Sequence, residues 1–326
     1  MIVVTGGAGF IGSNLVKFLS DDLKKEVCIV DWFEKKKESN NDKRKSILKV
    51  TPNKLKEFLK KNKSNIDIIL HMGAITATTE TDANLIIENN IKLSLFLWNW
   101  CSKNNKRFIY ASSAATYGNG GNGFDDDQSL RSLNKLQPLN LYGWSKHIID
   151  KLFVEQALKH NNPPQWVGLK FFNVFGPNEY HKGSMKSIVV KIFDVLAKDE
   201  SIKLFKSHNK NFVDGGQLRD FVYVKDVVKV VGWFINEKEK NGIYNVGTGK
   251  ARSFKDLALA VLKFSNKEQN ISYIETPKEI RDKYQYFTEA NISKLKNSGL
   301  PFNFYSLEQG IKDYILNHLS KDDRYI

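Results

Sequence analysis

The N-terminal sequence is Ile2-Val3-Val4-Thr5-Gly6-Gly7-Ala8-Gly9-Phe10-Ile11-Gly12, a short apolar run followed at once by a glycine-rich turn. A helical pattern follows from Ser13 to Leu19, and a second apolar run, Val27 to Val30, ends at Asp31. A strand that turns through glycines into a helix leaves backbone N–H groups free to bind a phosphate. The glycine spacing also matches the fingerprint of dinucleotide-binding turns, and the flanking strand and helix supply the context that the fingerprint requires.

Two features after the second run bear on the type of dinucleotide. Asp31 lies where an acidic side chain binds the adenosine ribose hydroxyls, which favours NAD. Lys35, Lys36 and Lys37 come soon after and could neutralise the additional phosphate of NADP. These residues alone leave both coenzymes open. Residues 34–65 are rich in lysine and asparagine with little periodicity outside a helical segment near 55–59, so we expect a variable surface excursion there.

Predicted strands alternate with predicted helices from residue 1 to residue 173. Further apolar runs occupy residues 66–71, 107–111 and 166–172. Such alternation predicts an α/β fold with a doubly wound parallel sheet, and residues 1–173 are expected to form the dinucleotide-binding domain.

The chain changes character after Gly176-Pro177. We expect residues 174–326 to form mainly a smaller C-terminal α/β substrate-binding lobe, with segments at about 220–250 returning to the first domain. The sequence predicts a helix from residue 181 to about residue 197. Capping boxes at Ser253 and Ser306 predict the starts of two more helices.

Tyr142 and Lys146 are four residues apart in a run of helical character, so their side chains share one helix face. A free tyrosine ionises near pH 10 and is a poor base at neutral pH. A nearby ammonium favours the phenolate, and bringing the tyrosine pKa to about 7 requires roughly 4 kcal/mol. Alone, such a pair could face solvent; beside a predicted dinucleotide site, we expect it to perform acid–base chemistry. Ser113 follows the predicted strand 107–111 at its carboxyl end, and open parallel sheets bind ligands at the carboxyl ends of their strands.

The totals exclude several classes of protein. The formal net charge is +14, but the lysines are dispersed, so we expect no nucleic-acid partner and at most attraction of a small anion. No apolar run approaches the ~20 residues of a membrane span, and no signal peptide is expected. Cys28 and Cys101 are predicted to be free thiols, which suits a cytoplasmic location. Asp125-Asp126-Asp127 has no histidine beside it, so we expect no metal site.

The glycine turn, Ser113 and the Tyr142/Lys146 pair together resemble the extended short-chain dehydrogenase/reductase superfamily (NAD-dependent epimerases and dehydratases), which has a Rossmann fold and acts on nucleotide sugars. Residues 173–177 and 219–224 are also similar to it, and the likeness covers nearly the whole chain. Residues 110–118, 181–185 and 284–288 look like the ADP-heptose 6-epimerase subfamily, isomerases that supply heptose for the lipopolysaccharide core. Homo-oligomers are usual in this superfamily, so we expect one here.

The resemblance implies a tightly bound NADP rather than NAD, held in part by an acid like Asp31 and one of the lysines Lys35 to Lys37. The positions that it assigns to the coenzyme are Gly6, Gly9, Phe10, Ile11, Gly12, Asp31, Trp32, Lys36, Met72, Gly73, Ala74, Ile75, Thr76, Asn89, Lys146 and Val174.

The resemblance also assigns positions to a sugar nucleotide such as ADP-heptose. They are Ser113, Asn173, Ser184, Lys191, Phe205, Lys206, Ser207, Arg219 and Tyr284. The family has histidine where this chain has Lys191, and the chain carries an insertion at about 208–216. Arg219 suits bidentate contact with a diphosphate, and a structural salt bridge is its alternative role.

Inverting a secondary alcohol carbon is simplest by oxidation to a ketone and return of hydride to the opposite face. The hydroxyl then points differently in the two half-reactions, so one fixed base serves one epimer poorly. The resemblance implies that Lys182 is the second base, with a phosphate-binding or surface lysine as the alternative. Tyr142 and Lys182 would each act as acid or base, with Lys146 beside Tyr142 and Ser113 orienting the reacting oxygen.

Other functions stay open. One is another nucleotide-sugar 4-epimerase or reductase. A dehydratase needs an acid pair after the Ser113 position, where this chain has Ala114-Ala115. A non-enzymatic NADP-binding regulator would be expected to lack the tyrosine or the lysine, and both are present.

Overall fold

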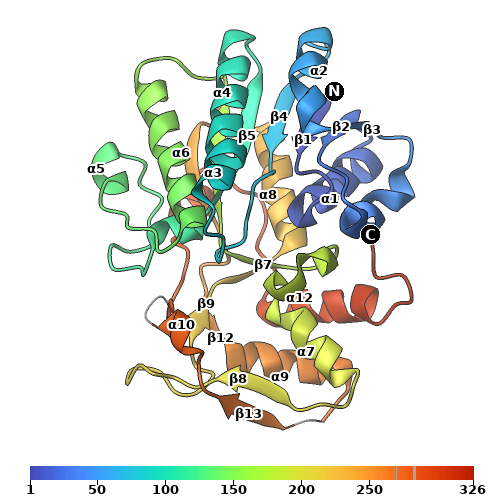
Figure 1. Ribbon diagram of the computed structural model, residues 1–326, viewed down its shortest axis with the longest axis vertical. Coiled ribbons are helices and arrows are strands. Elements are labelled where there is room, and N and C mark those ends of the chain that lie inside the picture. The colour runs from blue at the N-terminus through green and yellow to red at the C-terminus, as the bar shows by residue number, and fades with distance from the viewer. Residues whose placement is uncertain (269, 282–283) are drawn as a thin grey trace.

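A seven-stranded parallel sheet forms the larger part of the molecule (Figure 1). The computed structural model describes residues 1–268, 270–281 and 284–326. The strand order is β11-β6-β5-β4-β1-β2-β3. The bounds are β1 Ile2–Thr5, β2 Val27–Val30, β3 Leu48–Val50, β4 Ile68–His71, β5 Arg107–Ser113, β6 Trp166–Phe171 and β11 Gly242–Val246. The direction of strand addition reverses between β1 and β4, and ligands bind at such a reversal, beyond the carboxyl ends of the strands.

Helices cover both faces of this sheet, which confirms the doubly wound fold. Successive residues of a strand point to opposite faces, so Val4 packs in one core cluster with Leu15 and Val230, while Val3 packs in the other with Leu97 and Phe153. The helices of this part are α1 Phe10–Lys17, α2 Leu55–Lys61, α3 Ala83–Ile86, α4 Leu93–Lys103, α5 Leu130–Leu133, α6 Leu141–Leu158, α8 Val224–Asn236 and α11 Ser293–Asn297.

A smaller lobe lies below the sheet in Figure 1. It contains α7 Ile188–Leu196, β8 Ile202–Phe205, α9 Phe254–Ser265, β13 Ile271–Ile274, α10 Lys278–Arg281 and α12 Leu307–Tyr314, and β8 pairs with β13. The two predicted capping boxes are confirmed, with Ser253 capping α9 and Ser306 capping α12. Short pairs connect the two parts: β7 (Asn173–Phe175) with β10 (Phe221–Tyr223), and β9 (Leu218–Arg219) with β12 (Arg252–Ser253).

The lysine-rich segment after β2 differs from the surface excursion that we expected. Residues Lys35–Arg44 form a 3₁₀ helix, η2, whose Asn40 and Asn41 are buried. The Asn40 amide donates to the Ala8 carbonyl at 2.8 Å, and the Asn41 amide donates to the Gly7 carbonyl at 2.9 Å. The expectation failed because asparagine side chains anchor this segment by hydrogen bonds to the backbone of the glycine turn. Such contacts need no periodic hydrophobic residues, so the sequence pattern does not reveal them.

The continuous helix predicted from residue 181 to about 197 is wrong. A 3₁₀ helix, η6 (Tyr180–Met185), contains Gly183 at φ 55°, and Lys186 and Ser187 are extended before α7 begins at Ile188. The Glu179 carboxylate accepts hydrogen bonds from the backbone N–H and the hydroxyl of Ser187. Gly183 in the left-handed conformation and the Glu179 carboxylate turn the chain between residues 183 and 187, although the helical sequence pattern runs through these positions without a break.

Two further expectations concern the thiols and the membrane. Cys28 and Cys101 are free and buried, as predicted. Over the described ranges, no helix has the length and apolarity needed to span a bilayer.

A buried polar network lies between α6 and the sheet. Asp150 and Lys170 form an ion pair at 2.8 Å, with 0% and 1% of their side chains exposed. Asp150 also accepts from the hydroxyls of Tyr110 at 2.9 Å and Ser112 at 2.7 Å, and Lys170 donates to Thr116 at 2.6 Å. Each charge therefore has neutral partners as well as its counter-charge, which is what burial of an ion pair requires.

Breaking this ion pair from one side should cost more stability than removing both charges. In Lys170→Met the Asp150 carboxylate stays buried without its cation, and such losses typically cost about 3–5 kcal/mol of unfolding free energy. Lys170→Met combined with Asp150→Asn should recover most of that loss, because no charge remains buried. Urea unfolding measures the difference. Lys61→Met, in the exposed pair with Glu57, is the control and should leave the midpoint unchanged; equal losses in the single and double variants would contradict this account.

Candidate active site

A cavity of about 870 Å³ opens at the carboxyl ends of the sheet strands and continues into the smaller lobe. Its wall includes the glycine turn and Asp31, the pair Tyr142 and Lys182, and Arg219. This volume suits a large ligand or two ligands side by side. The cavity thus joins the predicted coenzyme and substrate positions in one space.

The glycine turn has the close packing that a dinucleotide-binding turn needs. A Cβ at Gly6 would lie 2.5 Å from the Cα of Gly73, and one at Gly12 would lie 2.1 Å from the Gly6 carbonyl oxygen. Helix α1 begins right after Gly9, which has no side chain to cap the first N–H groups. The helix N-terminus can therefore take a phosphate, and the residues present fit a dinucleotide.

The acidic residue at the end of β2 holds the turn and a lysine together. Asp31 accepts a hydrogen bond from the Ala8 N–H at 3.0 Å, and its other oxygen lies 3.1 Å from Nζ of Lys37. Lys36 instead pairs with Glu34 at 2.8 Å and is 61% exposed, against 18% for Lys37. Sequence reasoning placed Lys36 at the coenzyme, whereas the conformation of η2 brings Lys37 to the acid. Both lysines line the cavity.

The structure brings the predicted coenzyme positions together. The cavity wall contains Gly6, Gly9, Phe10, Ile11, Gly12, Asp31, Trp32, Lys36, Met72, Gly73, Ala74, Ile75, Thr76, Asn89, Lys146 and Val174. They come from the ends of β1, β2 and β4 and from helices on both sides of the reversal point, which is the arrangement that makes one long crevice.

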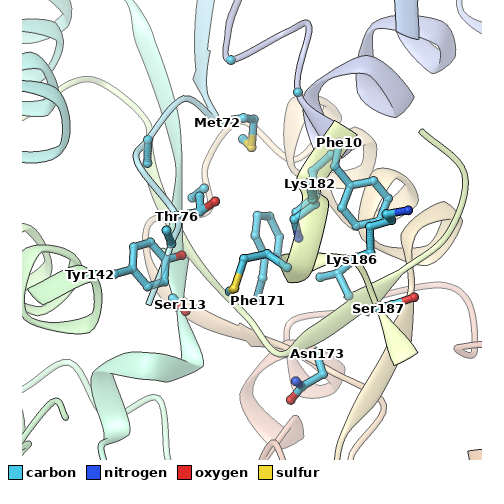
Figure 2. A pocket seen from close by; sticks show the side chains of 18 of the residues that line it. Phe10, Met72, Thr76, Ser113, Tyr142, Phe171, Asn173, Lys182, Lys186 and Ser187 are labelled. Atoms are coloured by element: carbon cyan, nitrogen blue, oxygen red, sulfur yellow. The ribbon is translucent and has the colours of Figure 1, made fainter. Parts of the chain in front are cut away.

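Tyr142 and Ser113 lie on one side of the cavity, and Lys182 and Phe10 lie on the opposite side (Figure 2). Asn140 caps α6 by accepting from the Gly143 N–H, so the helix presents Tyr142 in its first turn. Ser113 hydrogen-bonds with the Tyr142 hydroxyl. The two predicted acid–base groups therefore face one another across the space between them.

The expected activation of Tyr142 by Lys146 needs correction. Burial raises the pKa of Tyr142 above its usual value of 10.0; the hydrogen bond with Ser113 lowers it, and the Asp150 carboxylate raises it again. Lys146 Nζ donates to the Ala111 carbonyl at 2.7 Å, and burial lowers the pKa of this ammonium to about 8 despite Asp150. Protein groups alone thus favour the neutral phenol, because desolvation outweighs the hydrogen bond with Ser113.

Lys182 is held on the coenzyme side of the cavity by η6. Its ammonium lies 5.3 Å from the centroid of the Phe10 ring, at the start of α1. Burial lowers the pKa of Lys182, the Glu179 carboxylate raises it, and Lys191 lowers it. A lysine whose pKa is lowered by desolvation gives up its proton more readily than a surface lysine does.

Five predicted substrate positions line the cavity: Ser113, Asn173, Phe205, Arg219 and Tyr284. The Arg219 guanidinium lies between the rings of Tyr284 and Phe254, at 5.5 Å and 5.6 Å, and donates to the carbonyls of Leu218 and Gln285. No carboxylate among the described residues pairs with it. The guanidinium is therefore positioned by neutral groups, which suits an anionic ligand better than the alternative of a structural salt bridge.

The other four substrate positions, Ser184, Lys191, Lys206 and Ser207, lie outside the cavity wall. Lys206 pairs with Glu275 at 3.0 Å, and the Ser207 hydroxyl donates to the Asn209 carbonyl. The chain turns at Ser207, where Asp214 of the insertion accepts from its backbone N–H, and so these side chains do not reach the site.

Sequence reasoning missed several residues of the site. His181, Gln217 and Phe254 line the cavity without having been predicted. Lys170 and Asp150, below Tyr142, were also missed, although a lysine inside an apolar strand is a signal for a buried partner. Across the described ranges, no group of three or more histidine, cysteine, aspartate or glutamate side chains could hold a metal ion.

Gly12→Ala should abolish retention of a dinucleotide. The added Cβ, 2.1 Å from the Gly6 oxygen, would displace the turn that faces the phosphates. Coenzyme released by acid from the purified protein, measured by absorbance, should fall to background. Gly121→Ala is the control, because its Cβ would meet only the Asn119 side chain at 3.1 Å in an exposed loop. Full coenzyme content in Gly12→Ala would show that the turn is not the binding element.

Comparison with known proteins places the chain in a family. Residues 2–247 match the NAD dependent epimerase/dehydratase family. The ADP-L-glycero-D-manno-heptose-6-epimerase of Fusobacterium nucleatum is 48% identical over the full length of both chains, and that of Nitratidesulfovibrio vulgaris is 41% identical, also over both full lengths. The crystal structure of the Helicobacter pylori enzyme of the same name is 30% identical, with a TM-score of 0.77 over 97% of this chain and 95% of that one. The chain therefore belongs to the NAD dependent epimerase/dehydratase family and groups within it with the ADP-L-glycero-D-manno-heptose-6-epimerases.

Proposed function

We propose that this protein converts ADP-D-glycero-D-manno-heptose to ADP-L-glycero-D-manno-heptose by inverting C6″, a step that supplies heptose for the lipopolysaccharide core. The observation that carries this proposal is the placement of Tyr142 and Lys182 on opposite sides of one cavity (Figure 2). The names and full-length identities of the relatives support the same isomerase activity.

An inversion at a secondary alcohol carbon needs proton transfer at two oxygen positions. After the carbon becomes a ketone, the end of the sugar rotates so that its other face receives the hydride. The oxygen then lies nearer the opposite wall of the cavity. Tyr142 serves the oxygen in one orientation and Lys182 serves it in the other, each as base in one direction and acid in the reverse. Ser113, hydrogen-bonded to Tyr142, orients the reacting oxygen on that side.

The chain uses a nicotinamide dinucleotide, as a member of its family. When bound, it would supply reversible hydride transfer at the sugar carbon, so the overall reaction would consume no oxidant. The glycine turn, Asp31 and Lys146 would hold it. The oxidised ring is also a cation, and a cation near a phenol favours the phenolate, which would offset the effect of burial on Tyr142.

We propose that the coenzyme is NADP. The support is the pair of Asp31 with Lys37 at 3.1 Å, together with Lys36 on the same cavity wall, because two cations beside an acid can accept a phosphate at the ribose. We also propose a homo-oligomer, a cytoplasmic location and a division of the chain near residue 173, with residues around 220–250 returning to the first domain.

The alternatives are less well supported. A dehydratase would need acids after Ser113, and the side chains there are Ala114 and Ala115, which begin a short 3₁₀ helix. A non-enzymatic NADP-binding protein would not need Tyr142 and Lys182 on facing walls. A 4-epimerase of another nucleotide sugar shares the coenzyme site, and the choice of substrate distinguishes it.

Tyr142→Phe combined with Lys182→Met should abolish epimerisation, whereas each single variant should leave a small residual turnover, lowered equally in both directions. Each group serves one orientation of the oxygen and inversion needs both proton transfers, so loss of either group slows the whole reaction. Incubation with ADP-D-glycero-D-manno-heptose, followed by NMR at C6″, measures both directions. Lys198→Met, an exposed lysine at the end of α7, is the control. Full turnover in the double variant would refute the two-base scheme, and turnover only with a UDP-sugar would favour a 4-epimerase.

A further inference from the structure

His181 lies next to Lys182 in the chain and also lines the cavity, yet the proposed reaction gives it no role. Its ring contacts η2. The Asn40 amide nitrogen lies 3.2 Å from Nδ1 of His181 and donates to the Ala8 carbonyl at 2.8 Å. The turn that carries the proposed second base is thus in contact with the segment that packs on the glycine turn.

The hydrogen bonds indicate which ring nitrogen of His181 carries the proton. Asn40 Nδ2 donates to the Ala8 carbonyl, so it is the amide nitrogen, and Nδ1 of His181 is its acceptor. A neutral imidazole then carries its proton on Nε2. The Asn178 backbone carbonyl is an acceptor for this ring. Because His181 also lines the cavity, a phosphate bound there would compete with that carbonyl for the Nε2–H, and a charged acceptor is the stronger one.

The contact of His181 with Asn40 of η2 places its ring at the adenosine end of the site. In a 3₁₀ helix, residues three apart lie on the same side, so Asn40 and Lys37 are neighbours on one face of η2. Lys37 pairs with Asp31, the residue expected at the adenosine ribose. The pKa of His181 is lowered to about 4 by burial, then by Lys37 and Lys182, while the Asn178 carbonyl and Asp31 oppose this. The ring is therefore neutral at pH 7 and lies within reach of the charges of Lys37 and Asp31.

A network of side chains holds η6 on this end of the coenzyme site. Asn178 donates to the Ser13 hydroxyl at 3.0 Å and to the Asn40 carbonyl at 3.3 Å, and Asn14 donates to the Pro177 carbonyl at 2.9 Å. The segment before His181 is thus bonded to α1 and η2 together, and the ring has little freedom to leave the adenosine end.

We propose that His181 binds the ribose 2′-phosphate of NADP through its Nε2–H, beside Lys37. This inference rests on the proposed use of NADP. One short turn then recognises the coenzyme through residue 181 and supplies an acid–base group through residue 182. Binding of the phosphate would fix η6, and with it the position of Lys182, so His181 is both a coenzyme contact and a positioning residue for Lys182.

The test compares the two coenzymes on the same protein. Wild type, His181→Ala and His181→Gln are incubated with equal excesses of NADP and NAD and desalted, and the bound coenzymes are released and separated by chromatography. Wild type should hold mainly NADP. His181→Ala should lower the bound ratio of NADP to NAD by roughly tenfold or more, as expected for a lost hydrogen bond to a charged group, with the total bound coenzyme unchanged. His181→Gln keeps an N–H donor and should restore part of the ratio.

His208→Ala is the matched control, because His208 is outside the cavity wall and pairs with Glu275 at 3.4 Å. Lys37→Ala should lower the ratio as His181→Ala does. An unchanged ratio in His181→Ala would overturn the inference, and equal loss of NADP and NAD would overturn it in favour of a purely structural role. Wild type that holds only NAD would overturn it together with the NADP proposal, while leaving the epimerase activity, which is measured on the sugar, untouched.

Discussion

The close backbone contact at the glycine turn supports the rest of the site. The turn touches Gly73 after β4, accepts hydrogen bonds from Asn40 and Asn41 of η2, and begins the helix on which the segment before Lys182 packs. Three segments distant in the sequence therefore meet at one turn. Because a side chain at Gly6 or Gly12 would separate these backbones, the same feature that admits a phosphate also sets where the catalytic groups lie.

Burial acts on the two acid–base groups in the same sense. It raises the pKa of Tyr142 and lowers the pKa of Lys182, so both tend toward their uncharged forms. An uncharged phenol is an acid and an uncharged amine is a base, which is the combination that a reversible proton transfer across the cavity requires. The protein obtains this match mainly from desolvation on both walls, which at Lys182 outweighs the opposing effect of the Glu179 carboxylate.

Sequence alone predicted the sheet, because strand and helix periods alternate and Asp31 ends the second strand. It also predicted Tyr142, Ser113 and Lys146 as neighbours, since helix spacing and strand ends are local features. Lys37 could not be chosen over Lys36, because the choice depends on the conformation of a 3₁₀ helix with no hydrophobic pattern. Lys206 and Ser207 lie outside the cavity wall for a similar reason, because Asp214 of the insertion binds the Ser207 backbone N–H and turns the chain there.

The polar network under α6 has an evolutionary consequence. Gly168 lies in β6, where a Cβ would sit 2.4 Å from the Tyr110 hydroxyl, so the glycine makes room for the phenol that reaches Asp150. Asp150 in turn neutralises Lys170, and Lys170 binds Thr116. A descendant could exchange Gly168 only by accepting a steric clash, and Asp150 or Lys170 singly only by leaving a buried charge unmatched. These buried residues should therefore be conserved together, whereas the exposed lysines around them can be substituted independently.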